Sequence, residues 1–285
     1  MPRYDTISFL SDYGHEDEFV GVVHSVIRDI APDARVIDLT HGIPPHDTRA
    51  GGLALARAVQ YVAPGVILAV VDPGVGTSRR AVAVEVGDGA GVFLGPDNGL
   101  LAPAVAMAGG ATRAVELRDP SFHLPAPGPT FAGRDVFAPV AAHLCTGVEL
   151  DELGPAVDTT TLLPGVLPVS RSEGEVVVAE VLWVDRFGNA QLNVGPDELP
   201  GLRHTLTTGT VVRTATVAGT YGEVPPGGVG LVVDAYGLMS LALDRHSAAE
   251  ELGLEAGAEL RLAPLADEPS GSSTPLAFPT VRRET

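Results

Sequence analysis

Short apolar runs alternate with longer segments of helical pattern up to about residue 145, and no other feature constrains the fold as strongly. Residues 66–71 form a continuous apolar run rich in valine and isoleucine, which is typical of a strand buried on both faces. We expect strands at 7–10, 35–39, 66–71, 81–86 and 91–94, and helices at 18–30, 51–61 and 137–144. This alternation predicts an α/β layered domain with a mostly internal sheet.

The pattern changes in the second half of the chain. Residues 153–169 are rich in proline and glycine and read as a linker. Beyond them, 175–184, 205–217 and 230–233 are short, β-rich and separated by turns, which predicts a smaller β-barrel-like domain. We therefore expect an N-terminal α/β domain over 1–165, a C-terminal β domain over 170–263 and a disordered tail over 264–285.

Charge and composition exclude several classes of function. The net charge is −18, and every basic residue other than histidine is an arginine. The absence of lysine removes Schiff-base chemistry and a P-loop, and the acidic balance argues against nucleic-acid binding. A single cysteine, Cys145, excludes an internal disulfide framework and fits a reducing, cytoplasmic setting. We expect neither a membrane span nor a secretory signal.

Asp12 follows the first predicted strand directly, in the segment Ser11–Gly14. A carboxylate at the carboxyl end of a sheet strand lies where ligands bind in open α/β folds, and it can accept both hydroxyl groups of a ribose. Alternatively, the aspartate caps the helix that is expected to start near Asp17. The pattern leaves both interpretations open.

Asp72 and Arg79 lie on the glycine-rich loop that follows the most buried strand. The loop lacks the lysine of a Walker motif and the third glycine of a dinucleotide fingerprint. A carboxylate and a guanidinium on one tight loop either orient a water molecule and stabilise developing hydroxide, or form a structural ion pair. Only one of the adjacent Arg79 and Arg80 can face Asp72, and we expect Arg80 to be solvated or at a sheet edge.

The segment Thr130–Pro139 carries an aromatic residue, Phe131, that is suited to wall a ligand pocket. Its Arg134 and Asp135 are predicted to form an ion pair at the start of a helix rather than a catalytic pair.

A turn between two strands of the predicted C-terminal domain contains Asp185, Phe187 and Asn189. The acid, the aromatic face and the amide suit an ammonium group, a base ring and the edge of that ring, respectively. A hairpin built around an aspartate turn is the alternative.

The 8 histidines are scattered and form no HExxH or similarly tight ligand set, so we expect no metal site. A Ser–His–Asp triad lacks its GxSxG nucleophile elbow, and Cys145 reads as a core residue.

Taken together and in order, these motifs closely resemble one family. The segments are ISFLSDYGHEDEFVG, VIDLTHGIPPHD, VVDPGVGTSRR, FLGPDNGLL, TFAGRDVFAPVAAHL and DRFGN. They resemble the SAM-dependent hydroxide adenosyltransferases, which are adenosine-forming S-adenosyl-L-methionine hydrolases in the superfamily of fluorinase and chlorinase. The resemblance spans about Ile7 to Leu262. It implies an α/β domain, a β-barrel-like domain and a homotrimer that binds S-adenosyl-L-methionine between neighbouring subunits.

The resemblance also implies roles for individual residues. Asp12 matches the aspartate that binds the ribose hydroxyls, and Asp72 and Arg79 match two members of an Asp–Arg–His set that activates water. Asp185 resembles the residue that meets the methionine ammonium, and Asn189 the one that reads adenine. Further substrate contacts are expected at Phe131, Phe187, Ala235, Ser240 and Leu243, with Ala235 replacing a usual serine.

One departure from the family pattern concerns catalysis. The family has TFHGRD, and here Ala132 occupies the histidine position. A methyl group cannot orient water, and loss of such a group typically lowers a rate by about 10²–10⁴-fold. His123, nine residues earlier, is the one histidine that we consider as a substitute.

The expected function is hydrolysis of S-adenosyl-L-methionine to adenosine and L-methionine, impaired by Ala132 and requiring no cofactor. A protein that binds S-adenosyl-L-methionine or adenosine with little turnover is the first alternative. Transfer of halide to C5′ is the second, and it is disfavoured because Asp72 places a negative charge where an anion would bind.

Overall fold

The computed structural model describes residues 3–266. By their internal contacts, the described residues up to 167 and those from 168 onward form two compact units. The expected start of the tail at 264 is wrong, because Pro264 ends the last strand and pairs with His204. Residues 267–285 of that tail lie outside the described residues.

The first unit is built on a six-stranded sheet of order β2-β1-β3-β5-β4-β6. The β1–β2, β1–β3 and β3–β5 pairs are parallel, whereas β4 runs antiparallel to both β5 and β6. The strands are β1 (Thr6–Ser11), β2 (Arg35–Thr40), β3 (Val66–Val70), β4 (Ala81–Val86), β5 (Gly91–Pro96) and β6 (Ala111–Glu116). The α/β prediction is confirmed, although the sequence pattern gave no indication of β6.

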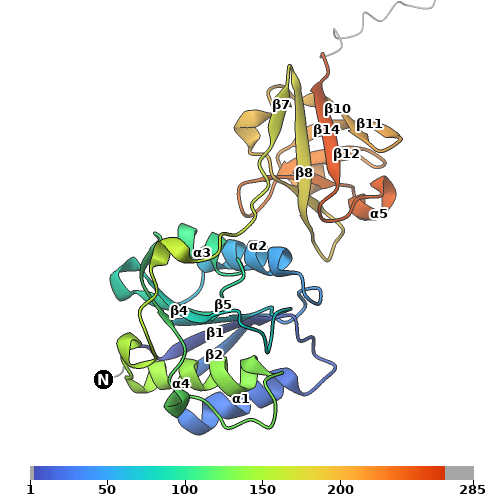
Figure 1. Cartoon of the computed structure of the whole chain (residues 1–285). Helices are drawn as coiled ribbons and strands as arrows, with labels where there is room; N and C mark the ends of the chain where they lie inside the picture. The colour runs from blue at the N-terminus through green and yellow to red at the C-terminus, as the bar shows by residue number, and fades with distance from the viewer. Residues whose placement is uncertain (1–2, 267–285) are drawn as a thin grey trace, which may run out of the picture. The chain divides into compact units, whose positions relative to one another are not determined.

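Helices cover both faces of this sheet (Figure 1). The pair α1 and α4 lies on one face, and the pair α2 and α3 lies on the other. Their bounds are α1 (Phe19–Ile30), α2 (Thr48–Val59), α3 (Ala102–Met107) and α4 (Ala138–Thr146). The α2 helix begins earlier than expected because the Asp47 carboxylate accepts the Ala50 N–H at 2.8 Å and caps it. Two apolar cores result, one on each face, which is why β1 and β3 are buried throughout.

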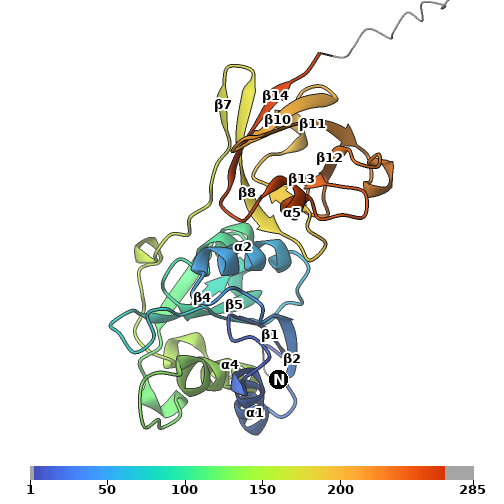
Figure 2. The same cartoon turned by 90° about the vertical axis from the view of Figure 1, so that its right-hand side faces the viewer.

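The second unit is a barrel (Figure 2). Its eight-stranded sheet has the order β14-β10-β11-β12-β13-β9-β8-β7, and β14 also pairs with β8 to close the ring. The strands are β7 (Arg171–Glu173), β8 (Val176–Val184), β9 (Ala190–Leu192), β10 (Arg203–Thr208), β11 (Val211–Ala218), β12 (Val229–Val233), β13 (Met239–Ala242) and β14 (Glu259–Pro264), with one helix, α5 (Ala248–Leu252). The barrel-like prediction is confirmed.

The run 205–217, expected as one β-rich stretch, is a hairpin. Strands β10 and β11 pair in antiparallel fashion from Arg203↔Thr216 to Thr208↔Val211. Gly209 in the connecting turn has a φ of +52°, which glycine adopts without a steric penalty. Short 3-10 turns lie at Gly87–Gly89, Pro120–Phe122, Leu150–Glu152, Thr159–Thr161, Pro196–Glu198 and Tyr221–Glu223.

Candidate active site

Three neighbouring parallel strands of the first unit end at one edge of the sheet. Asp12 follows β1, His41 follows β2, and Asp72 comes two residues after β3. All three residues line one cavity of about 960 Å³, together with Tyr13, Phe131 and Ala132. The order of the strands therefore brings together side chains that are far apart in the sequence. This is the edge at which open α/β sheets bind ligands.

Asp12 is positioned by a loop from the neighbouring strand. Its Oδ2 accepts the backbone N–H of His46 at 2.9 Å. The helix-capping alternative is wrong, because α1 has Glu18 at its N-cap and no side chain bonds to its first turn. The Asp12 carboxylate is thus fixed at one oxygen and lines the cavity, and its other oxygen has no hydrogen-bond partner among the described residues.

Asp72 and Arg79 form a bidentate ion pair. The Arg79 Nε donates to Oδ1 and Oδ2 of Asp72 at 2.9 and 3.0 Å, and its Nη2 also donates to Oδ2. The Arg79 guanidinium carbon lies 5.4 Å from the centre of the buried Phe137 ring, in cation–π contact. Asp72 lines the cavity and Arg79 does not, so the guanidinium sits behind the carboxylate and fixes its orientation.

Arg80, which we expected to be solvated or at a sheet edge, instead precedes β4, an internal strand of the sheet, and makes structural contacts. Its Nε donates to Oδ2 of Asp97 at 2.8 Å, and its other nitrogens donate to the side chain and carbonyl of Thr161 at 3.0 and 2.6 Å. Asp97 accepts the Leu163 N–H at 2.8 Å with its second oxygen. The expectation was wrong because two partners that are remote in the sequence, Asp97 and Thr161, lie within reach of the Arg80 guanidinium.

The segment around Ala132 forms part of the cavity wall and also carries an ion pair, as predicted. Residues Gly133–Phe137 form a π-helical turn that leads into α4. Arg134 Nε donates to Oδ1 of the buried Asp135 at 2.5 Å, which confirms the predicted pair at the start of the helix. Phe131 and Ala132 precede this turn and line the cavity. At position 132 the cavity wall therefore presents a methyl group.

His123 is not among the residues that line this cavity. Its Nε2 is buried and has no hydrogen-bond partner among the described residues, and burial lowers the pKa of its imidazole. Its position gives no support to a role as substitute for the missing histidine.

The Asp185 turn of the second unit is a hairpin turn held by the aspartate itself. Oδ1 accepts the N–H groups of Phe187 and Asn189 at 2.8 Å each, and Oδ2 accepts the Asn189 side-chain amide at 2.8 Å. The Phe187 ring is 80% exposed, and the amide oxygen of Asn189 accepts no hydrogen bond within the described chain. The turn thus presents an aromatic face and an amide edge to the outside.

Three further residues that we expected to contact the substrate differ in exposure. Ala235 is exposed in the turn between β12 and β13, Leu243 is half-buried, and Ser240 is only 2% exposed within β13. Asp234 anchors this turn by accepting the N–H groups of Tyr236 and Leu238 at 2.8 and 3.2 Å.

Comparison with protein-family profiles gives matches over most of the chain. Residues 7–154 match the SAM hydroxide adenosyltransferase N-terminal domain, and residues 179–261 match the corresponding C-terminal domain. The chain belongs to the SAM hydroxide adenosyltransferase family.

Relatives of this SAM hydroxide adenosyltransferase include characterised proteins and solved structures. The (R)-S-adenosyl-L-methionine hydrolase of Salinispora arenicola is 45% identical over 256 residues, which covers 90% of this chain and 97% of the relative. A crystal structure of an uncharacterized conserved protein from Thermotoga maritima aligns with a TM-score of 0.84 at 32% identity, over 90% of this chain and 100% of that one. A fluorinase from an Actinoplanes species is more distant, at 27% identity over 217 residues, covering 68% of this chain and 72% of that one.

Tyr13 and His41 are among the cavity residues of this adenosyltransferase to which the sequence gave us no reason to assign a role. Tyr13 lies next to Asp12, and His41 is the first residue after β2. The His41 Nδ1 lies 2.7 Å from the Ser11 hydroxyl oxygen, and its Nε2 lies 3.1 Å from Oδ1 of Asp38. Their position directly after strands β1 and β2 was the available signal, since ligand-binding side chains gather at such ends.

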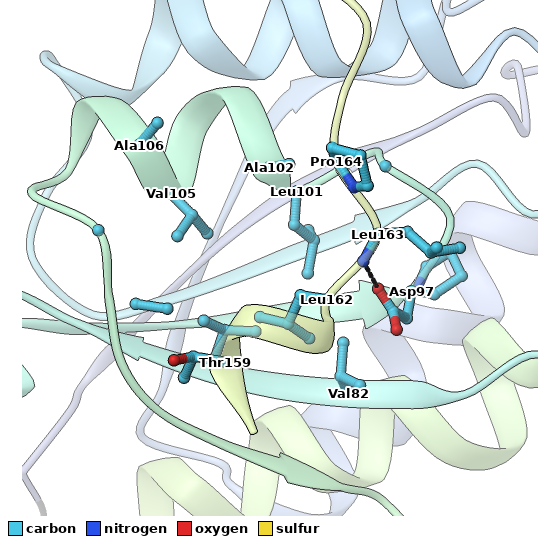
Figure 3. A pocket seen from close by; sticks show the side chains of 15 residues that line it. Val82, Asp97, Leu101, Ala102, Val105, Ala106, Thr159, Leu162, Leu163 and Pro164 are labelled. Atoms are coloured by element: carbon cyan, nitrogen blue, oxygen red, sulfur yellow. Dashed lines mark hydrogen bonds between the residues drawn. The ribbon is translucent and has the colours of Figure 1, made fainter. Parts of the chain in front are cut away.

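A second, smaller cavity of about 260 Å³ lies between α3 and the segment 159–164 (Figure 3). Its lining is mostly apolar, with Val82, Leu101, Val105 and Leu162 among the side chains. Both oxygens of Asp97, which also lines it, are bonded to Arg80 and Leu163. This cavity belongs to the packing of the segment 159–164 and lies apart from Asp12 and Asp72.

Residues 3–266 contain neither a membrane-spanning helix nor a metal-binding cluster. No helix there is long and apolar enough to cross a membrane. No group of three or more His, Cys, Asp or Glu residues there is arranged to hold a metal ion.

Proposed function

We propose that this protein hydrolyses S-adenosyl-L-methionine to adenosine and L-methionine. The observation that carries the proposal is the placement of two carboxylates, Asp12 and Asp72, at adjacent strand ends in one cavity of a family member. Two negative charges favour a cationic sulfonium substrate and disfavour an anionic one. Asp12, with one oxygen free, is the group that we assign to the ribose hydroxyls.

The reaction is an in-line displacement at C5′ of the ribose. A water oxygen bonds to C5′, the C5′–S bond breaks, and its electron pair returns to sulfur, which leaves as the neutral thioether of methionine. The leaving group needs no proton. The attacking water must lose one of its two protons, so that a hydroxyl group remains on C5′. Asp72 first accepts a hydrogen bond from the water, then takes this proton and releases it to solvent. The chemistry needs no metal or redox cofactor.

Arg79 acts on this step through Asp72. Because the guanidinium binds both carboxylate oxygens from behind, it fixes the direction in which the carboxylate faces the cavity. Oδ1 of Asp72, which accepts one N–H of Arg79, keeps a lone pair that can accept a hydrogen bond from water. We therefore assign Asp72 the contact with the reacting water and Arg79 a positioning role.

The remaining substrate contacts are proposed for Phe131 and for the two turns of the second unit. The free amide oxygen of Asn189 suits an adenine amino group, and the exposed Phe187 ring suits stacking on a base. Asp185 already binds three donors of its own turn, so its contact with an ammonium group would have to use the remaining lone pairs. Ala235, Ser240 and Leu243 complete the set that we propose.

We further propose a homotrimer in which each substrate contacts neighbouring copies of the chain. The 80% exposure of Phe187 supports this, because a large apolar side chain on a turn gains from being covered. Light scattering of the purified protein should give three times the mass of the 29.3 kDa chain. A cytoplasmic location is part of the same proposal and fits the free Cys145.

Chromatography of products tests the proposed reaction. Incubation with S-adenosyl-L-methionine should yield adenosine and methionine in equal amounts, and Asp72→Asn should abolish both. Addition of chloride or fluoride should produce no 5′-halo-adenosine, since an anion would be repelled by Asp72. A product other than adenosine, or an Asp72→Asn variant as active as the parent, would contradict the proposal.

A second candidate function, binding without efficient turnover, is favoured by one observation. The cavity wall carries Ala132 where the family pattern has histidine. Calorimetry that shows tight binding of S-adenosyl-L-methionine, with no adenosine after long incubation, would establish this candidate in place of hydrolysis.

A further inference from the structure

The Tyr13 side chain enters the cavity from a rigid turn. Tyr13 follows Asp12 at the end of β1, and its N–H donates to the Ser11 hydroxyl oxygen at 3.3 Å. The next residue, Gly14, has a φ of +66° and donates its N–H to the His41 carbonyl at 2.8 Å. The turn is therefore tied to the end of β1 on one side and to the residue after β2 on the other, and the backbone of Tyr13 has little freedom to move.

The ring of Tyr13 is held by other aromatic side chains. Its centre lies 5.7 Å from that of Phe19 and 5.6 Å from that of Phe131, and those two are 5.1 Å apart. The contacts are edge-on or tilted, the arrangements that aromatic pairs prefer. A ring enclosed in this way holds its hydroxyl group at one place in the cavity.

That place is beside Ala132 and near Asp72. A Cβ atom on Gly133 would lie 2.1 Å from the Tyr13 Oη, so the hydroxyl rests against the backbone next to Ala132. Burial, and then the charges of Asp12 and Asp72, raise the pKa of the Tyr13 phenol, so it stays protonated. Among the described residues, the hydrogen bond of Tyr13 comes from its backbone N–H, and none involves this hydroxyl.

A water molecule that attacks C5′ must have both of its hydrogens directed away from the carbon. Asp72 can accept one of them, and Phe131, Ala132 and Gly133 offer no polar side-chain atom for the other. The His41 side chain also lines the cavity, but its ring is fully buried and its Nε2 is not exposed to a water molecule there. Of the side chains of Tyr13, Phe131 and Ala132 at this wall, that of Tyr13 carries an oxygen.

We propose that the Tyr13 hydroxyl oxygen accepts the second hydrogen of the attacking water and so aims its lone pair at C5′. This inference rests on the proposed hydrolysis. One proton of the water passes to Asp72 and the other stays on the oxygen that becomes the 5′-hydroxyl of adenosine. The phenol keeps its own proton throughout, so Tyr13 orients the water and does not act as the base.

The test compares Tyr13→Phe with Tyr61→Phe, a control at a 73% exposed tyrosine at the end of α2. Because Tyr13→Phe keeps the ring, thermal denaturation should be almost unchanged. We expect kcat for adenosine release to fall about 10²-fold, with KM almost unchanged, because only the orientation of the water is lost. Tyr61→Phe should match the parent.

The Tyr13→Phe and Tyr61→Phe variants are also measured in an Ala132→His background. That substitution places an imidazole acceptor next to the Tyr13 hydroxyl. There the loss caused by Tyr13→Phe should shrink to less than about 10-fold, since two groups can now orient the water. An unchanged kcat in Tyr13→Phe, or equal losses in both backgrounds, would overturn the role of Tyr13. Adenosine formed equally by the parent and by Tyr13→Phe would overturn the role of Tyr13 and leave the proposed function intact, whereas activity seen only with Ala132→His would overturn hydrolysis by the parent chain as well. No adenosine from any variant would overturn both.

Discussion

The Arg79 guanidinium binds both carboxylate oxygens of Asp72, and behind the ion pair the Phe137 ring supports the guanidinium. The side chains of Asp72 and Arg79 are 6% and 16% exposed, so the pair is largely shielded from solvent. Shielding strengthens the interaction and makes an unpaired Asp72 unfavourable. The orientation of the carboxylate toward the cavity therefore depends on this one arginine.

Substitution of the two adjacent arginines should separate activity from stability. Arg79→Ala should lower kcat per folded molecule by about 10²–10³-fold, because Asp72 loses its fixed orientation. Arg80→Ala should leave kcat within a few fold and lower the free energy of unfolding by about 2 kcal/mol, since the buried Asp97 loses its charged partner. Steady-state kinetics and urea denaturation measure the two effects, best in an Ala132→His background where the rate is higher. Equal losses of kcat would show that the two arginines have been misassigned.

Ala132→His should raise the rate of adenosine formation. The side chain at 132 lines the cavity beside the proposed site of the attacking water, and an imidazole there adds a group able to orient it. A gain of about 10²-fold in kcat is expected, at the low end for an added acid–base group, because Tyr13 already supplies one contact. Ala132→Leu serves as a control for size, and it should give no gain. A similar gain in both variants would point to packing rather than hydrogen bonding.

The sequence indicated most elements of the first unit because their signals are local. Residues 66–71 are apolar throughout, and β3 is buried along its whole length. The loop pair of Asp72 and Arg79 was likewise within reach, since both lie on one turn. The sequence could not supply the strand order β2-β1-β3. This order places His41 on one side of Asp12, and Asp72 on the other. The contact of Arg80 with Thr161 was hidden for the same reason, because the partner lies far along the chain.

Acidification should destabilise the second unit through His204. This side chain is 1% exposed, on β10, and neither ring nitrogen has a hydrogen-bond partner among the described residues. Burial lowers its pKa below the ordinary value of about 6.5. The unfolded chain therefore binds the proton more readily, so stability is full above pH 6.5 and falls as the pH drops through that value. His204→Leu should raise the free energy of unfolding by about 1–2 kcal/mol at pH 7.5, and by more at pH 5.5. Urea denaturation at both pH values gives the comparison, and an equal gain at each would rule out a contribution from protonation.

Gly133→Ala should disturb the cavity through Tyr13. The added Cβ would lie 2.1 Å from Oη and 3.0 Å from Cζ of Tyr13, so the phenol must shift away from the wall. We expect a loss of about 1–3 kcal/mol in the free energy of unfolding, as for other overpacked sites, together with a lower kcat. Removal of the hydroxyl relieves the shorter contact, so Tyr13→Phe should recover part of the lost stability when it is combined with Gly133→Ala. It should recover none of the activity, because the oxygen that orients the water is then absent. Additive effects on stability would mean that Oη does not rest against Gly133, and the position assigned to the hydroxyl would be wrong.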